Sequence, residues 1–130
     1  MVIDTSALIA MLFAEPERDA YTRAIASQSV RLVSAMSKFE AGMVAIGRYG
    51  ETAAEELDRL MRDLTMQVVS FDERQADIAR DAFARYGKGR HRAGLNFGDC
   101  AAYALAMAEA EPLLFKGTAF GATDVQVVAV

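Results

Sequence analysis

Residues 1–8 read Met1-Val2-Ile3-Asp4-Thr5-Ser6-Ala7-Leu8, and this stretch decides the fold. The apolar triplet at its start predicts the end of a buried strand. Thr5 and Ser6 are typical helix-capping residues, and an apolar helix over Ala7–Phe13 follows them. Asp4 therefore stands where a strand ends and a helix begins. In open α/β sheets this position lies beside the ligand site.

The same alternation of short apolar runs and longer helical patterns continues along the chain. Further strands are predicted over Arg31–Val33, Met66–Phe71, Leu113–Phe115 and Val125–Val128. Helices are predicted over Pro16–Ser27, Ser34–Arg48, Glu51–Leu64, Glu73–Tyr86 and Gly98–Glu111. This order predicts an α/β fold in three layers, with a mostly parallel sheet of about five strands and helices on both faces. No linker or repeat divides the chain, so we expect one domain over residues 1–130.

Composition narrows the class of protein. The chain has 130 residues, of which 53% are apolar and 25% are charged, as in an ordinary globular domain. The lone cysteine, Cys100, allows no internal disulfide and suits a reducing cytoplasm, where we expect a buried structural thiol. No segment predicts a signal peptide or a membrane span. The net charge of −4 argues against a purely charge-driven nucleic-acid binder.

Three carboxylates stand in segments that are otherwise apolar enough to be core. Asp4 ends the first strand, Glu40 interrupts a helical stripe that includes Met36 and Met43, and Asp99 opens an alanine-rich helix. Burying an isolated carboxylate costs several kcal/mol or forces it to take a proton. Brought together, three such groups are suitable oxygen ligands for a hard divalent cation.

Each of these acids also has a structural interpretation. Asp4 could cap the first helix, and Asp99 could occupy the third position of a helix capped by Asn96. Glu40 could form an internal ion pair, for instance with Lys116 or an arginine. The residues alone leave these alternatives open, although Glu40 in an apolar stripe favours a functional site.

Other chemistries find little support. The chain has no glycine-rich phosphate loop and no cysteine–histidine spacing for zinc, and His91 has no evident nucleophile partner. Basic residues concentrate in the segment with Arg85, Lys88, Arg90 and Arg92. That segment is either a solvated loop or a set of phosphate contacts.

The acidic residues and their neighbours resemble a known family. The matching segments are Met1–Leu8, Glu40 in a mid-chain helix, Leu95-Asn96-Phe97-Gly98-Asp99-Cys100, and Leu113–Gly117 followed by Phe120 and Thr123-Asp124. In this order and spacing they resemble the PIN-domain ribonucleases, specifically the VapC toxins of bacterial type II toxin–antitoxin systems. The match spans the whole chain.

The resemblance implies a PIN-like fold and a Mg²⁺- or Mn²⁺-dependent endoribonuclease. By position, Asp4 and Asp99 would be metal ligands and Glu40 would complete the catalytic site, with Thr5 or Ser6 beside them. It also implies a VapB-type antitoxin partner whose C-terminal segment covers the acidic groove, and a homodimer, for which the helices Glu51–Leu64 and Glu73–Tyr86 are candidate surfaces. From charge alone, we expect Arg90 and Arg92 to hold the RNA backbone.

One departure from the family pattern bears on activity. Thr118 and Ala119 stand where an acid is usual after the Lys-Gly pair, so we expect weaker metal binding unless Asp124 or Thr118 compensates. This loss motivates an alternative function, a catalytically weakened PIN-fold protein that binds its antitoxin and regulates their promoter. A receiver domain of the signalling type is disfavoured, because Thr5 and Ser6 stand where its paired acids would follow the first strand.

Overall fold

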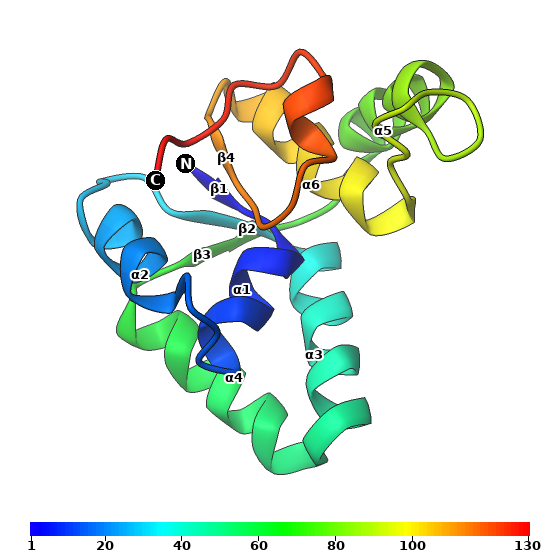
Figure 1. Cartoon of the computed structure of the whole chain (residues 1–130). Helices are drawn as coiled ribbons and strands as arrows, with labels where there is room; N and C mark the ends of the chain where they lie inside the picture. Colours follow the sequence, from blue (N-terminus) through cyan, green and yellow to red (C-terminus); the bar gives the residue numbers. More distant parts are fainter.

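A parallel sheet forms the centre of the structure, a computed structural model that describes residues 1–130 (Figure 1). Its strands are β1 (Val2–Ile3), β2 (Leu32–Ser34), β3 (Gln67–Val69) and β4 (Leu113–Leu114). The strand order is β3-β2-β1-β4, and every pairing is parallel. Val2 pairs with Leu32 on one side and Leu113 on the other, so β1 is central. The predicted α/β class is confirmed.

The predicted strand count is wrong, because the sheet has four strands rather than about five. Val125–Val128 was expected to be the last strand, yet it meets the sheet only through an isolated parallel bridge between Val127 and Leu113. Leu113 N donates to Gln126 O at 2.8 Å and Val128 N donates to Leu113 O at 3.0 Å. Both hydrogen bonds belong to Leu113, so this segment contacts β4 at one residue and forms no ladder.

Six helices and one 3₁₀ turn connect and cover the strands. They are α1 (Thr5–Leu12), α2 (Arg18–Ala26), α3 (Ala35–Tyr49), α4 (Glu51–Asp63), α5 (Glu73–Tyr86), α6 (Phe97–Glu109) and η1 (Phe120–Ala122). Four helices begin at a side chain that accepts a hydrogen bond from the first turn, namely Asp4, Ser34, Asp72 and Asn96. Such caps satisfy backbone N–H groups that have no partner within the helix. Gly50, at φ 79°, permits the sharp turn from α3 into α4.

The sheet separates two apolar cores, which gives the predicted three layers. Successive side chains on a strand point to opposite faces. Ile3 packs into a core with residues of α1 to α4, whereas its neighbour Val2 packs into a second core with α6. Figure 1 shows α1, α2, α3 and α4 on one side of the sheet and α5 and α6 on the other. No helix is both long enough and apolar enough to cross a bilayer.

The apolar stripe around Glu40 is only partly core, which corrects the sequence-based interpretation of α3: Val44 is half-buried and packs against the core, whereas Met43 is exposed. This helix buries its small residues, Ser37, Ala41 and Ala45. Most of its large apolar side chains face outward: Phe39, Met43, Ile46 and Tyr49 are 63%, 56%, 49% and 72% exposed. Periodicity alone predicted the burial of this face, but the α1–α3 and α3–α4 contacts instead use small side chains that let the helices approach closely. We call Phe39, Met43 and Ile46 the α3 face.

Candidate active site at the carboxyl end of the sheet

Asp4 lies at the carboxyl end of the central strand and caps α1. Its Oδ2 accepts hydrogen bonds from Ser6 N at 2.9 Å and from Ser6 Oγ at 2.6 Å. Its Oδ1 is buried and has no hydrogen-bond partner. The side chain is only 3% exposed. The capping interpretation is therefore correct for one oxygen, while the second oxygen is left for another ligand.

Burial sets the protonation of Asp4. It raises the pKa of this carboxyl from 3.8 to about 6, against the two hydrogen bonds from Ser6, which lower it. The negative charges of Asp99 and Glu40 raise the pKa further. These two acids are thus close enough to Asp4 for their charges to act on it through the protein.

Asp99 occupies the first turn of α6, as the structural alternative predicted. Its Oδ2 accepts from Asn96 N at 3.0 Å, and Asn96 Oδ1 accepts from Asp99 N at 2.9 Å, which makes a reciprocal capping box. The carboxyl is half-buried, and this burial raises its pKa despite the hydrogen bond from Asn96. The charge of Glu40 raises it as well. Its helical neighbours Ala102 and Tyr103 are buried, as expected.

Glu40 reaches the same place from α3. Its carboxylate lies against Gly98 in the first turn of α6, so closely that a Cβ at Gly98 would overlap it. Lys116, considered above as its ion-pair partner, instead pairs with Glu15 and with Glu17, the latter at 3.1 Å. No arginine pairs with Glu40 either, so the internal ion-pair interpretation is wrong. The sequence analysis did not identify Gly98 as a residue of the site. A glycine directly before Asp99 could have suggested that another group approaches the backbone closely there.

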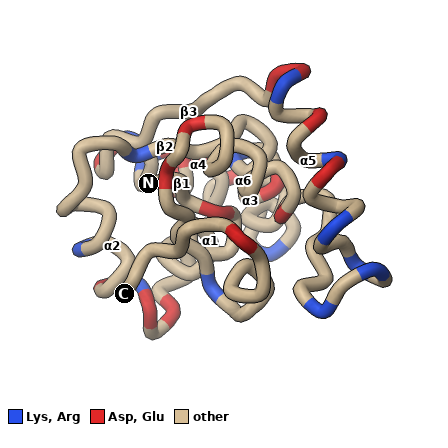
Figure 2. Tube along the Cα trace, turned by 90° about the horizontal axis from the view of Figure 1, so that it is seen from above, with Lys and Arg blue, Asp and Glu red and all other residues tan.

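The three acids are neighbours, but they do not form a closed ligand set. No group of three acidic, histidine or cysteine side chains comes close enough to hold one ion. Even so, the unpartnered Asp4 Oδ1 and the mutual repulsion of the acids fit a divalent cation better than they fit an unliganded pocket. In Figure 2, acidic positions gather in the middle of the molecule around α1, α3 and α6.

Of the weaker candidates, Ser6 and Thr5 lie at the site. Ser6 Oγ donates to Asp4 and accepts from Lys116 N at 2.9 Å, so it links Asp4 to the segment after β4. Thr5 Oγ1 donates to Ser37 O at 3.4 Å, which ties α1 to α3. Ser6 therefore orients Asp4 directly, whereas Thr5 holds the helix that Asp4 caps against α3.

Asp124, considered above as a replacement for the missing fourth acid, is engaged by other residues. Tyr103 Oη donates to its Oδ1 at 2.6 Å, and Arg85 Nη2 pairs with its Oδ2 at 3.0 Å. These contacts lower the pKa of Asp124, and none of the three site acids contributes to that shift. Thr118 is exposed and makes no hydrogen bond that would hold it at the site.

The basic segment after α5 forms an exposed loop closed by a bridge between Gly87 and Leu95. Arg92 is exposed and forms no ion pair, whereas Arg90 Nε donates to Ala84 O at 3.0 Å. Figure 2 shows basic positions along this side of the molecule, next to α5 and away from the central acids. Cys100 is buried, and burial raises its pKa to about 11, as expected for a structural thiol.

Comparison with known proteins identifies the family of this arrangement. The family model described as "PIN domain" matches residues 1–126. The chain belongs to the PIN-domain family. Within it, the chain is 51% identical to "Ribonuclease VapC" of Mycolicibacterium smegmatis over 98% of this chain and 99% of the relative. It is 47% identical to "Ribonuclease VapC30" of Mycobacterium tuberculosis over 99% and 98% of the two chains. The VapC resemblance inferred from the acidic segments is confirmed.

Solved structures support the same PIN fold. Mycobacterium tuberculosis VapC20, described as a toxin that cleaves the sarcin–ricin loop, matches with a TM-score of 0.79 at 18% identity, over 98% of this chain and 97% of that one. A chain of Rickettsia felis VapBC2, solved with a DNA fragment from the promoter of the pair, matches with a TM-score of 0.77 at 12% identity, over 98% and 96%. At these identities the likeness concerns the fold alone.

Proposed function

We propose that this PIN-domain protein is the toxin of a type II toxin–antitoxin pair, an endoribonuclease that requires Mg²⁺ or Mn²⁺ and acts in the cytoplasm as one domain over residues 1–130. The observation that carries the proposal is Asp4, a buried carboxylate with one unpartnered oxygen and two acids nearby. The similarity to VapC ribonucleases over nearly the whole chain supports it.

In this proposal Asp4 and Asp99 hold the cation, and Glu40 completes the acidic lining. Such a cation lowers the pKa of water and neutralises charge that develops on a phosphate. The protein's own contribution is orientation. Ser6 binds one oxygen of Asp4 and leaves the other free, and Asn96 N fixes one oxygen of Asp99. Because these contacts are set before substrate arrives, little reorganisation is needed on binding.

The exposed loop supplies the contacts to RNA. Arg90 and Arg92 lie in a segment with no acidic residue, and Arg92 forms no ion pair. Guanidinium groups pair well with phosphate oxygens, so these arginines hold the substrate backbone while the acids act on one phosphate. Their role is to position RNA rather than to choose its sequence.

A VapB-type antitoxin and a second copy of the chain are the proposed protein partners. The excess negative charge at Asp4, Asp99 and Glu40 suits a cationic antitoxin side chain, which would neutralise the acids in place of the metal. For the homodimer, α4 is a poor surface, because it buries Leu57 and Met61 against the rest of the protein. The α3 face is exposed and apolar, and we assign the dimer contact to it.

The decisive test incubates purified protein with total RNA and Mg²⁺, and maps the new RNA ends. Asp4→Asn and Asp99→Asn should each reduce cleavage at least about 100-fold, since each removes a proposed ligand. Asp63→Asn removes the same charge at an exposed position of α4, and this variant should cleave normally. EDTA should abolish cleavage by the parent protein. Undiminished cleavage in both site variants would refute the carboxylate mechanism.

The alternative function is not favoured by the comparisons, which match VapC ribonucleases; it rests on two observations, that the acids do not close into a three-ligand group and that Thr118 and Ala119 stand where an acid was expected. In that case the protein binds its antitoxin and regulates their promoter without cutting RNA. Calorimetric titration with Mg²⁺ and Mn²⁺ separates the two proposals. Metal binding that Asp4→Asn abolishes supports the nuclease, whereas tight antitoxin binding without metal binding or cleavage supports the regulator.

A further inference from the structure

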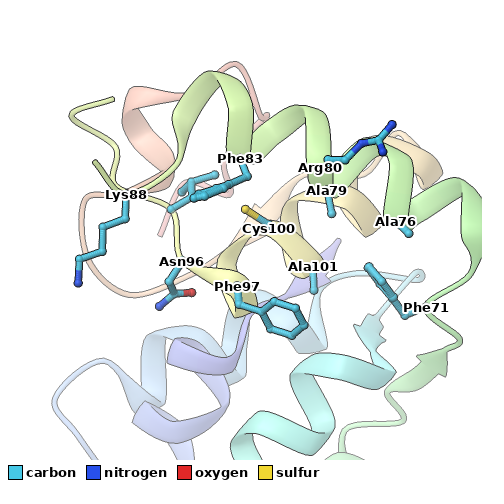
Figure 3. Close-up of a pocket in the computed structure, with 11 residues that line it drawn as sticks. Phe71, Ala76, Ala79, Arg80, Phe83, Lys88, Asn96, Phe97, Cys100 and Ala101 are labelled. Atoms are coloured by element: carbon cyan, nitrogen blue, oxygen red, sulfur yellow. The ribbon is translucent and has the colours of Figure 1, made fainter. Parts of the chain in front are cut away.

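An apolar cavity lies beside the acidic site, between α5 and α6. Its volume is about 490 Å³, within the range of pockets that bind small organic ligands. The space exists because the facing helices present small side chains there, Ala76, Ala79 and Ala101, while Leu95 and Cys100 are buried beneath it. In Figure 3, Ala76 and Ala79 of α5 and Cys100 of α6 lie in the gap between the two helices.

Aromatic side chains border the cavity. Phe83 comes from α5, Phe71 precedes that helix, and Phe97 opens α6. Phe97 is 78% exposed, an unusual position for so large an apolar group, and Phe83 is 40% exposed. In Figure 3 the Phe97 ring extends along the cavity toward Phe71. Flat apolar rings at an open rim suit a flat apolar ligand that can stack on them.

The rim also carries positive charge and a free amide. Lys88 and Arg80 line the cavity, and neither forms an ion pair in the protein. Lys88 is held there because its backbone N donates to Leu95 O at 2.9 Å, which closes the basic loop. Asn96 lines the same rim, and its Oδ1 is used by Asp99 N, so its amide N–H groups remain available. The ligand that combines these features has a flat apolar face, a polar edge and an anionic chain.

The cavity and the acids share one segment of α6. Asn96 and Phe97 line the cavity, Gly98 touches Glu40, and Asp99 is the proposed ligand. Phe97 and Asp99 both belong to the first turn of α6, so a group seated against Phe97 lies within one helical turn of the residue that would hold the cation. We propose that the α5–α6 cavity is a nucleobase subsite, in which an unstacked base of the RNA next to the scissile phosphate stacks on Phe97 while Lys88 binds its phosphate. This inference deepens the proposed RNA cleavage and rests on it.

Binding in EDTA tests the subsite without any cleavage. The probes are fluorescein-labelled oligoadenylate, oligocytidylate and oligouridylate, with an abasic ribose-phosphate oligomer of equal length and charge. At least one base-containing probe should bind about tenfold more tightly than the abasic oligomer, because a base stacked on an aromatic ring contributes on that scale. Phe97→Ala should remove this difference, and Phe97→Tyr should restore it. Lys88→Gln should weaken all probes alike, abasic included.

Tyr49→Ala is the matched control, since Tyr49 is 72% exposed on the opposite end of α3 from the site and lies outside the cavity. It should leave the base preference unchanged. Equal binding of base-containing and abasic probes, or a base preference that survives Phe97→Ala, overturns the inference. So does a change in oligomeric state on Phe97→Ala with unchanged RNA affinity, which would assign the cavity to a protein contact.

The outcomes also separate this inference from the proposed function. Base-dependent binding lost in Phe97→Ala, in a protein that cuts no RNA, supports the subsite and refutes only the nuclease. Metal-dependent cleavage with base-independent binding supports the nuclease and refutes only the subsite.

Discussion

The carboxylate of Glu40 lies against the backbone of Gly98, and this contact joins α3 to the first turn of α6. No other residue type fits at position 98 without moving the acid, because a Cβ there would overlap the carboxylate. Gly98→Ala should therefore displace Glu40 and lower the rate of RNA cleavage by about 100-fold, the scale on which small misplacements act. Cleavage rates under single-turnover conditions measure this effect.

Gly47→Ala provides the control for Gly98→Ala. Gly47 lies in the interior of α3, and a Cβ there would meet nothing within 4 Å. That variant should be stabilised by about 0.5–1 kcal/mol through helix propensity and should cleave normally. If Gly98→Ala cleaves as fast as Gly47→Ala, the position of Glu40 does not matter to the reaction.

Local sequence signals predicted most of the fold. The strand before Asp4 and the helix after it lie where the sequence predicted. Helix capping and apolar periodicity depend on residues that are close together in the chain, so both can be recognised from local sequence. The Asn96 cap with Asp99 at the third position was also visible as a pattern. Both acids take part in helix capping, and both are also the residues that we propose for the site. The capping and catalytic interpretations were never exclusive, since a carboxylate has two oxygens.

Predictions that depended on tertiary contacts were less successful. The spacing of Met36, Met43 and Val44 is the same for a buried and an exposed stripe, so it could not reveal that α3 packs through its small residues. The fifth strand was predicted from the valines of Val125–Val128, but this pattern could not reveal that the segment would meet β4 at one residue only. The partner of Asp124 lies 21 residues away on α6, beyond any local pattern.

Asp124 should matter for stability rather than for metal binding. Asp124→Asn weakens its contacts with Tyr103 and Arg85, and we expect a loss of about 1 kcal/mol in the free energy of unfolding near neutral pH. Since folding lowers the pKa of Asp124, its contribution is present above the unfolded pKa and is lost as the pH falls through the folded value. Urea unfolding across acidic pH measures this.

The matched measurement for Asp124→Asn is metal titration by calorimetry. The variant should bind Mg²⁺ or Mn²⁺ with parental affinity, because Asp124 is engaged elsewhere. A large loss of metal affinity would mean that the C-terminal turn rearranges to bring this acid to the site.

Asp4 should make the metal-free protein less stable as the pH rises. Burial raises its pKa from 3.8 to about 6, so the folded protein favours the protonated form. Its contribution is complete below the unfolded value and is lost as the pH rises through about 6, at a cost of about 3 kcal/mol. In EDTA, the free energy of unfolding should decline over that range, and Asp99, whose pKa is also raised, should add to the decline.

Asp4→Asn isolates this effect, because asparagine retains the cap but does not ionise. The variant should lose most of the decline seen in EDTA. Added Mg²⁺ should restore stability to the parent above about pH 6 and leave the variant unchanged, since a ligand that binds only the folded state stabilises it. A parent protein whose stability in EDTA is flat over this range would show that Asp4 is already neutralised within the protein.

Cys100 should be nearly inert in the folded protein. Burial, with a smaller effect from Asp99, raises the pKa of its thiol to about 11, so only about a thousandth of it is thiolate near pH 8. Iodoacetamide should therefore modify the native protein at least about 100-fold more slowly than the urea-unfolded protein, as followed by mass spectrometry. The thiol lines the α5–α6 cavity, so this rate also reports on its occupancy. Rapid modification of native protein would show that the reagent reaches the thiol through the cavity and that burial does not suppress its reactivity.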